Sequence, residues 1–95
     1  MRKLEDFRNK IGHIVIPCSR AQVIEAFRGF GICDQCGKTA PHGYLLPVLG
    51  HRWFCQGCKD EWESRAIFYQ EDVAFEDETA MEMLRMLLGL KPKAL

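Results

Sequence analysis

Two Cys-x-x-Cys pairs constrain this chain more than any other feature of its sequence. Cys33 and Cys36 form the first pair, Cys55 and Cys58 form the second, and eighteen residues lie between the pairs. Two pairs at this separation can close a tetrahedron of thiolates around one ion, and zinc is the metal that such sites most often hold. The sequence therefore predicts a structural Zn²⁺ site with these four ligands. Two disulfides, or four thiols in the core, are the alternatives.

The rest of the composition is that of an ordinary globular chain. Its 95 residues correspond to one domain, and 47% of them are hydrophobic while 27% are charged. No run is long enough to span a membrane, and the charged N-terminal stretch lacks the apolar region of a signal peptide. We therefore expect a cytoplasmic protein without a membrane partner, in a reducing compartment where paired cysteines hold metal more often than they form disulfides.

The N-terminal third is expected to fold as helix, strand and helix. Apolar residues at spacings of three and four predict a helix over residues 1–11, and a β-branched run predicts a buried strand over 13–17. Ser19 and Gln22 match a capping box, which predicts a helix over 20–28.

The two cysteine pairs are expected to lie in different local structures. Residues 33–38 predict a tight knuckle, in which Gly37 permits the positive φ that this turn requires. Residues 44–49 and 51–54 predict a hairpin that turns at Gly50. Cys58 falls in the first turn of a helix predicted over 56–69, where free amides and the helix dipole favour thiolate over thiol.

The C-terminal third is expected to begin with an extended segment. Residues 70–78 are acidic, with two alternating apolar side chains. A second capping box, Thr79 with Glu82, predicts a last helix that ends near Leu88.

The order of knuckle, hairpin and helix between Cys33 and about Arg65 resembles the treble-clef superfamily of zinc fingers, with a spacing similar to that of GATA-type and LIM fingers. The expected fold class is thus α+β: a small single domain (1–95) with a treble-clef-like zinc finger flanked by N-terminal helices and a C-terminal helix. Its expected parts are an N-terminal helix-strand-helix, the zinc finger, and an acidic connection with the last helix, over residues 1–31, 32–69 and 70–95.

An iron site of the rubredoxin-like kind is the competing interpretation of four cysteines. Rubredoxin-like proteins carry a glycine after the second cysteine of each knuckle, and the first cysteine pair of this chain resembles that pattern. In this chain Gly37 follows Cys36, but Cys58 is followed by helix-forming residues. Zinc is therefore preferred.

Charge is balanced overall, with 13 basic and 13 acidic residues, but it is unevenly distributed. Residues 31–78 contain four basic and nine acidic residues, whereas residues 1–30 contain six basic and three acidic ones. GATA-type fingers read DNA with basic residues in the helix and beyond it, and the corresponding stretch is acidic here. The six basic residues of the N-terminal part are Arg2, Lys3, Arg8, Lys10, Arg20 and Arg28.

Two functions are compatible with these patterns. The first is a zinc-stabilised module that binds another protein, and the alternative is a nucleic-acid-binding finger that uses the basic N-terminal helices. A closed four-cysteine site and the lack of an acid–base constellation in the sequence argue against an enzyme. His42 and His51 are expected to be surface or hairpin residues rather than ligands, and Cys18 is expected to be a buried, inert thiol.

The last helix suggests a partner surface. In residues 79–90 the side chains of Thr79, Glu82 and Arg85 are the polar ones before Gly89, and they form one narrow ridge. We expect one side of this helix to pack on the domain and the other to meet a second protein, most simply another copy in a two-fold dimer. Coverage of the second side by the N-terminal helices is the alternative.

Overall fold

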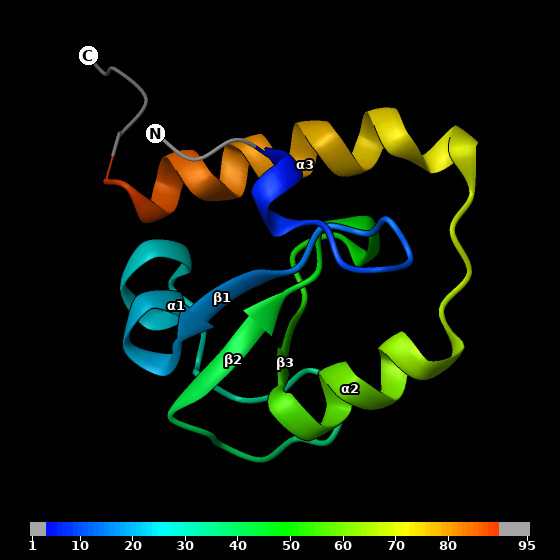
Figure 1. Ribbon diagram of the computed structural model, residues 1–95. Coiled ribbons are helices and arrows are strands. Elements are labelled where there is room, and N and C mark those ends of the chain that lie inside the picture. The colour runs from blue at the N-terminus through cyan, green and yellow to red at the C-terminus, as the bar shows by residue number, and fades with distance from the viewer. Residues whose placement is uncertain (1–3, 90–95) are drawn as a thin grey trace.

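A three-stranded antiparallel sheet, in the order β1-β2-β3, occupies the middle of the molecule (Figure 1). This computed structural model describes residues 4–89 of the chain. The strands are β1 (Ile16–Ser19), β2 (His42–Leu45) and β3 (Trp53–Cys55). Ile16 pairs with Leu45, and Leu45 pairs with Trp53, so that three buried apolar side chains form a row across the sheet.

Over residues 4–89, three α-helices and three 3-10 turns surround the sheet. They are η1 (Leu4–Phe7), α1 (Arg20–Phe27), η2 (Pro47–Leu49), α2 (Gln56–Arg65), η3 (Gln70–Asp72) and α3 (Val73–Leu87). In Figure 1, α3 runs across the top of the sheet, while α2 lies below it. α3 contacts α1, η1 and η2, whereas α2 contacts β2 and β3. The sheet thus separates two layers, and the α+β prediction is confirmed at this level.

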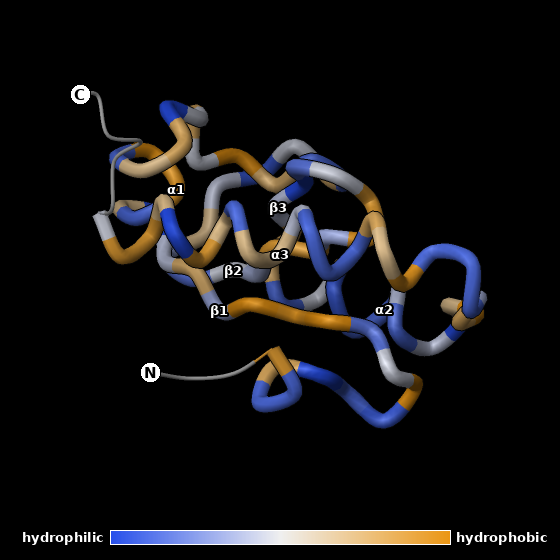
Figure 2. The backbone as a smooth tube through the Cα atoms, turned by 90° about the horizontal axis from the view of Figure 1, so that it is seen from above, coloured by the Kyte–Doolittle hydropathy of each residue, from blue (hydrophilic) through white to orange (hydrophobic). Residues whose placement is uncertain are grey.

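The sheet has a hydrophobic core on each face. Figure 2 shows the apolar run of β1. Ile14, Ile16 and Cys18 of this run pack with α1 and α3, while Val15 between them packs on the opposite side. The first core consists of Ile14, Ile16, Cys18, Val23, Leu45, Trp53, Ala80 and Met83. The second consists of Cys33, Leu46 and Phe54, against which Cys55, Cys58 and Trp62 pack.

The capping box that was predicted for α1 is present. Ser19 accepts a hydrogen bond from the Gln22 amide at 3.1 Å, and the Gln22 side chain accepts one from the Ser19 amide at 2.8 Å. The helix ends one residue earlier than predicted, because Arg28 adopts a left-handed conformation with φ of 57°. The local signals therefore located this helix to within one residue.

The N-terminal prediction is wrong within the described residues. Instead of a helix over 1–11, of which residues 1–3 lie outside the described part, the chain forms a 3-10 turn and then bridges Arg8 to Ile14. Asn9 Oδ1 accepts hydrogen bonds from the amides of residues 11, 12 and 13, each at 3.0 Å. A side-chain acceptor of this kind competes with the helical ladder and diverts the chain into a turn. As a result the strand begins at Ile16 rather than at residue 13.

The predicted hairpin is present, but its arms are shifted: β2 covers His42–Leu45 rather than 44–49, and β3 covers Trp53–Cys55 rather than 51–54. Tyr44 pairs with Phe54, and the turn includes Gly50 at a φ of 86°. Pro47 does not bulge the first arm but ends it, because residues 47–49 form η2. Proline has no amide hydrogen for a ladder, which explains why β2 stops before it.

The beginning of the last helix was also predicted wrongly. Residues 70–78 are not extended: they form η3 and the first turns of α3, and α2 ends at Arg65 rather than near residue 69. Thr79 lies inside α3 and is buried, so it does not cap the helix. Glu76, Ala80 and Met83 lie on the buried face of α3. Because a glutamate occupies one of these core positions, the sequence does not show the helical spacing of apolar residues here.

A buried polar cluster, which the sequence did not reveal, joins α3 to the N-terminal segment. The side chain of His13 is 2% exposed and that of Glu76 is 0% exposed. Glu76 Oε2 lies 3.0 Å from His13 Nδ1 and accepts a hydrogen bond from the Ile14 amide at 3.0 Å. The other carboxylate oxygen, Oε1, lies 3.8 Å from Arg8 Nη1. His13 Nε2 lies 3.1 Å from the carbonyl oxygen of Ile67. Both ring nitrogens of His13 therefore have an oxygen partner, and the ring is held between α3 and the segment that follows α2.

Replacing Glu76 by alanine should cost about 3 kcal/mol of stability, because it leaves the buried His13 ring and the Ile14 amide without their acceptor. The measurement is denaturant unfolding of the zinc-loaded protein at a fixed zinc concentration. Glu61→Ala, at an exposed position of α2, is the matched control and should change stability by less than about 0.5 kcal/mol. A loss at Glu76 as small as that of the control would contradict the importance of the cluster.

Candidate metal centre

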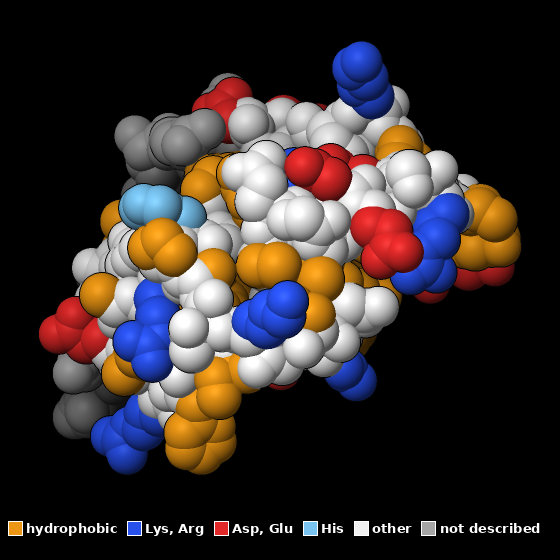
Figure 3. Space-filling model, turned by 90° about the horizontal axis from the view of Figure 1, so that it is seen from below, with side chains coloured by type: hydrophobic (Ala, Val, Ile, Leu, Met, Phe, Trp, Pro, Cys, Tyr) orange, Lys and Arg blue, Asp and Glu red, His pale blue; other side chains and the backbone are white. Residues whose placement is uncertain are grey.

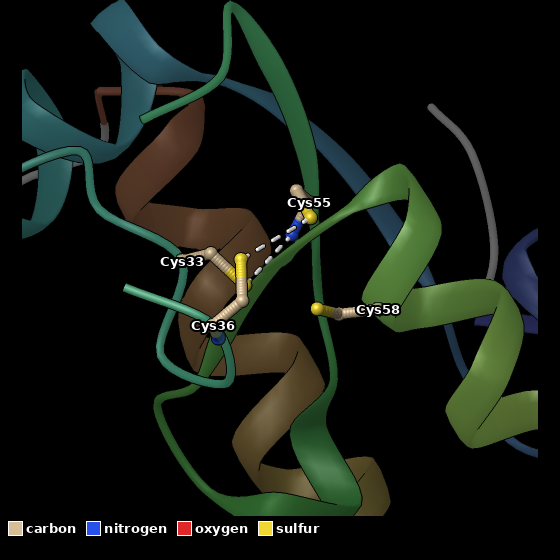
Figure 4. Close-up of side chains that lie close together, drawn as sticks. All are labelled: Cys33, Cys36, Cys55 and Cys58. Carbon is tan, nitrogen blue, oxygen red and sulfur yellow. Dashed lines mark hydrogen bonds between the residues drawn. The ribbon is translucent and has the colours of Figure 1, made fainter. Parts of the chain in front are cut away.

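The four predicted cysteines lie together. Their sulfur atoms are all within 4.8 Å of one another, as Figure 4 shows for the side chains that point toward a common centre. Cys33 and Cys36 come from the loop between α1 and β2, Cys55 ends β3, and Cys58 lies in the first turn of α2. Within residues 4–89, no other group of histidine, cysteine or acidic side chains is arranged to hold an ion.

The first cysteine pair forms the expected knuckle. The Gly37 amide donates to the carbonyl of Cys33 at 2.9 Å, and the Cys33 amide donates to the carbonyl of Lys38 at 2.9 Å. Gly37 has a φ of 76°, which is the positive value that the sequence predicted. This turn directs the amides of Gln35 and Cys36 at Cys33 Sγ, at 3.4 and 3.5 Å.

Asp34 fixes the knuckle to β3, a role that sequence reasoning missed. The Asp34 amide donates to the Trp53 carbonyl at 2.8 Å, and Asp34 Oδ2 accepts the Trp53 amide at 2.8 Å. This pairing brings the Cys55 amide to within 3.3 Å of Cys33 Sγ. The sequence signal for this role was an aspartate directly after a cysteine of the cluster, where its carboxylate can accept hydrogen bonds from backbone amides.

The four thiols are not electrostatically equivalent. Burial raises the pKa of Cys33, but the amides of Cys36, Cys55 and Gln35 outweigh it and lower that pKa to about 6. Desolvation, together with hydrogen bonds to the neighbouring thiols and the charge of Cys33, raises the pKa of Cys58 to about 12. A cluster of this kind cannot ionise fully by itself, and a divalent cation would supply the missing positive charge.

The spacing of the sulfur atoms fits a tetrahedral ion. Cys36 Sγ lies 3.9 Å from Cys55 Sγ. A tetrahedron with metal–sulfur bonds of about 2.3 Å has an edge of about 3.8 Å, whereas a disulfide bond is about 2.05 Å long. The four cysteines could therefore hold a metal ion with little movement.

The other candidate residues lie elsewhere. His51 Nε2 is 3.8 Å from Glu82 of α3, and His42 is exposed at the start of β2. Cys18 is 2% exposed in the core on the other face of the sheet, and burial raises its pKa to about 11. This placement confirms that Cys18 is buried and apart from the cluster.

The aromatic side chains are divided between the two faces of the sheet. Phe54 and Trp62 pack beside the cysteines. Trp53 lies in the core formed with α1 and α3, where its indole N–H donates to the Cys18 carbonyl at 2.9 Å. A Cβ at Gly43 would lie 2.4 Å from the Trp53 ring, so only glycine fits beside it.

Comparison with known proteins gives no relative from which a function could be transferred. Neither a protein-family model, nor a curated protein, nor a solved structure matches this chain. In the part of the chain that the structure describes, no helix is both long and apolar enough to cross a membrane.

Purified protein should contain about one equivalent of zinc per chain, and Cys33→Ser should lose it and unfold the surrounding loop. Metal binding contributes on the order of 10 kcal/mol in small zinc modules. Elemental analysis and circular dichroism measure the two effects. Cys18→Ala, a cysteine change outside the cluster, should keep the full zinc content. Iron in place of zinc, no metal, or a disulfide among the four cysteines would refute the assignment.

Asp34→Ala should weaken zinc retention by about tenfold or more, because residues that orient metal ligands typically contribute this much. Competition with a chromophoric chelator measures the affinity. Asp60→Ala removes an exposed carboxylate of α2 and serves as the control with unchanged affinity. Equal affinities for the two variants would mean that Asp34 does not position the knuckle.

Proposed function

We propose that this chain is a small structural-zinc protein that acts as a protein–protein interaction module. Its metal site would be a treble-clef-like finger formed by the knuckle at Cys33 and Cys36, the β2–β3 hairpin and α2. Zinc is preferred to iron because the second pair, Cys55 and Cys58, enters a helix and has no second glycine knuckle.

A structural role for the metal follows from the ligand count. Four thiolates would fill a tetrahedral ion and leave no position for water or substrate, in contrast to catalytic zinc sites with three protein ligands. Cys33, the most buried ligand, is 1% exposed and packs with Leu46 and Phe54. We therefore assign the site to stabilisation of the fold rather than to catalysis.

Exposed apolar side chains in the walls of two grooves are the observation that carries the proposal. One, of about 450 Å³, lies between α1 and the β-hairpin and includes Phe27, Phe30 and Ile32. The other, of about 590 Å³, lies along α3 and includes Phe75 and Met81. The Phe30 ring is 84% exposed, and Phe75 and Met81 are 53% and 52% exposed. Exposed apolar groups that gather at grooves are typical of protein-binding surfaces.

The basic residues support a protein partner over nucleic acid. Arg8 donates to Glu5, Asp77 and the carbonyl of Gly12, so its charge is already neutralised within the chain. The Arg20 side chain donates to the carbonyls of Gly31 and Phe30. On the face opposite α3, Lys and Arg side chains stand in separate groups among apolar and acidic ones (Figure 3). Such a surface lacks the basic stripe that tracks a phosphate backbone.

A photo-reactive amino acid in place of Phe30 or Met81 should cross-link to a protein in the source cells. The same amino acid at Glu61, which is exposed on α2, is the control and should not cross-link. Separately, duplex and single-stranded nucleic acid should bind with dissociation constants weaker than about 1 μM at physiological salt. Tighter, salt-dependent binding, or cross-links to nucleic acid alone, would favour the alternative function.

A further inference from the structure

The outward face of α3 carries a regular row of exposed side chains. Opposite the buried Glu76, Ala80 and Met83, this row occupies every third or fourth position, which is the spacing of helix–helix contacts. We call the row the α3 seam; it consists of Ala74, Glu78, Met81, Arg85 and Leu88, all of them exposed. α1, η1 and η2 cover part of the apolar surface of α3, but Met81 and Leu88 remain 52% and 63% exposed.

Read from either end, the α3 seam has nearly the same spacing of apolar and charged side chains, with the acidic and basic positions exchanged. Met81 is at the centre, and Ala74 and Leu88 each lie seven residues from it. Glu78 lies three residues before Met81, and Arg85 lies four residues after it. Rotation by a two-fold axis near Met81 therefore exchanges the acidic position with the basic one, while apolar positions remain apolar. A surface with this property is complementary to itself.

We propose that the α3 seam binds a second copy of this chain, with the two α3 helices antiparallel. Glu78 of each copy would lie opposite Arg85 of the other, and the two Met81 side chains would meet at the axis. The proposal rests on the proposed function, since it names the protein partner of an interaction module. A parallel arrangement would place Glu78 against Glu78 and Arg85 against Arg85, and the repulsion selects the antiparallel one.

The charges of the seam are available for such pairing. Among the residues that the structure describes, neither Glu78 nor Arg85 forms an ion pair within the chain. Both line the groove of about 590 Å³ on α3, together with Met81 and Phe75. Glu82 belongs to the same groove, and its Oε1 lies 3.8 Å from His51 Nε2.

The size of the surface sets the expected strength of the dimer. α3 has fifteen residues, which corresponds to a length of about 22 Å. One pair of helices of this length buries less surface than a standard stable interface, which buries about 800 Å² on each partner. We therefore expect a dissociation constant in the micromolar range and an assembly that depends on concentration.

Sedimentation equilibrium of the zinc-loaded full chain, over roughly 1 to 300 μM, tests the proposal. The wild type should approach twice its mass of 11.0 kDa. Glu78→Arg and Arg85→Glu should each weaken association by about tenfold or more, because each turns both ion pairs into like-charge pairs. The double variant Glu78→Arg/Arg85→Glu should dimerise again, and an equimolar mixture of the two single variants should form a heterodimer.

Glu25→Arg makes the same change of charge at an exposed position of α1 and should leave the dimer unchanged. A wild type that stays monomeric throughout the range would overturn the proposal, as would single variants that associate like the wild type or a double variant without recovery. Cross-linking at Phe30 or Met81 to a different protein, with a monomeric wild type, would overturn the self-association alone and leave the proposed function intact.

Discussion

Strand β3 is the element on which both halves of the structure depend, because its successive side chains point to opposite faces of the sheet. Trp53 is buried with β1, α1 and α3, whereas Phe54 is buried with Cys33 and Leu46. The next residue, Cys55, brings its sulfur into the cysteine cluster, and its amide donates to Cys33 Sγ. A slip of one residue in the pairing of β3 would exchange these faces and withdraw Cys55. The metal centre and the hydrophobic core therefore require the same register, and each reinforces the other.

Helix α2 is positioned by contacts at its two ends and by Trp62, which packs against the second core between them. None of its residues is fully buried. At its beginning Cys58 belongs to the metal cluster, and near its end Glu63 accepts the Asn9 side-chain amide at 2.8 Å. Just beyond it, the carbonyl of Ile67 lies 3.1 Å from His13 Nε2. Thiols at one end, a buried polar cluster at the other and Trp62 between them hold this helix, whereas most helices are held by a continuous apolar stripe.

The parts of the fold that the sequence predicted are those determined by residues close together along the chain. The Ser19–Gln22 capping box, the positive φ of Gly37 and the entry of Cys58 into a helix each depend on neighbouring residues alone. The start of α3 could not be predicted in this way, because a glutamate such as Glu76 is normally expected at the surface. Its burial is explained only by His13, sixty-three positions away, and by the Ile14 amide. The docking of Asp34 onto Trp53 is a long-range feature of the same kind.

The metal centre and the outward face of α3 lie on opposite layers, yet the β-hairpin connects them. The residues between β2 and β3 form η2, which contacts α3, while the same hairpin ends at Cys55 in the cluster. The hairpin thus contacts α3 at one end and the cysteine cluster at the other. For an assembly that forms through the α3 seam, metal binding would therefore favour association. By thermodynamic reciprocity, association would strengthen metal retention by the same factor. A metal bound at the cysteine cluster would then serve the interaction surface without being part of it.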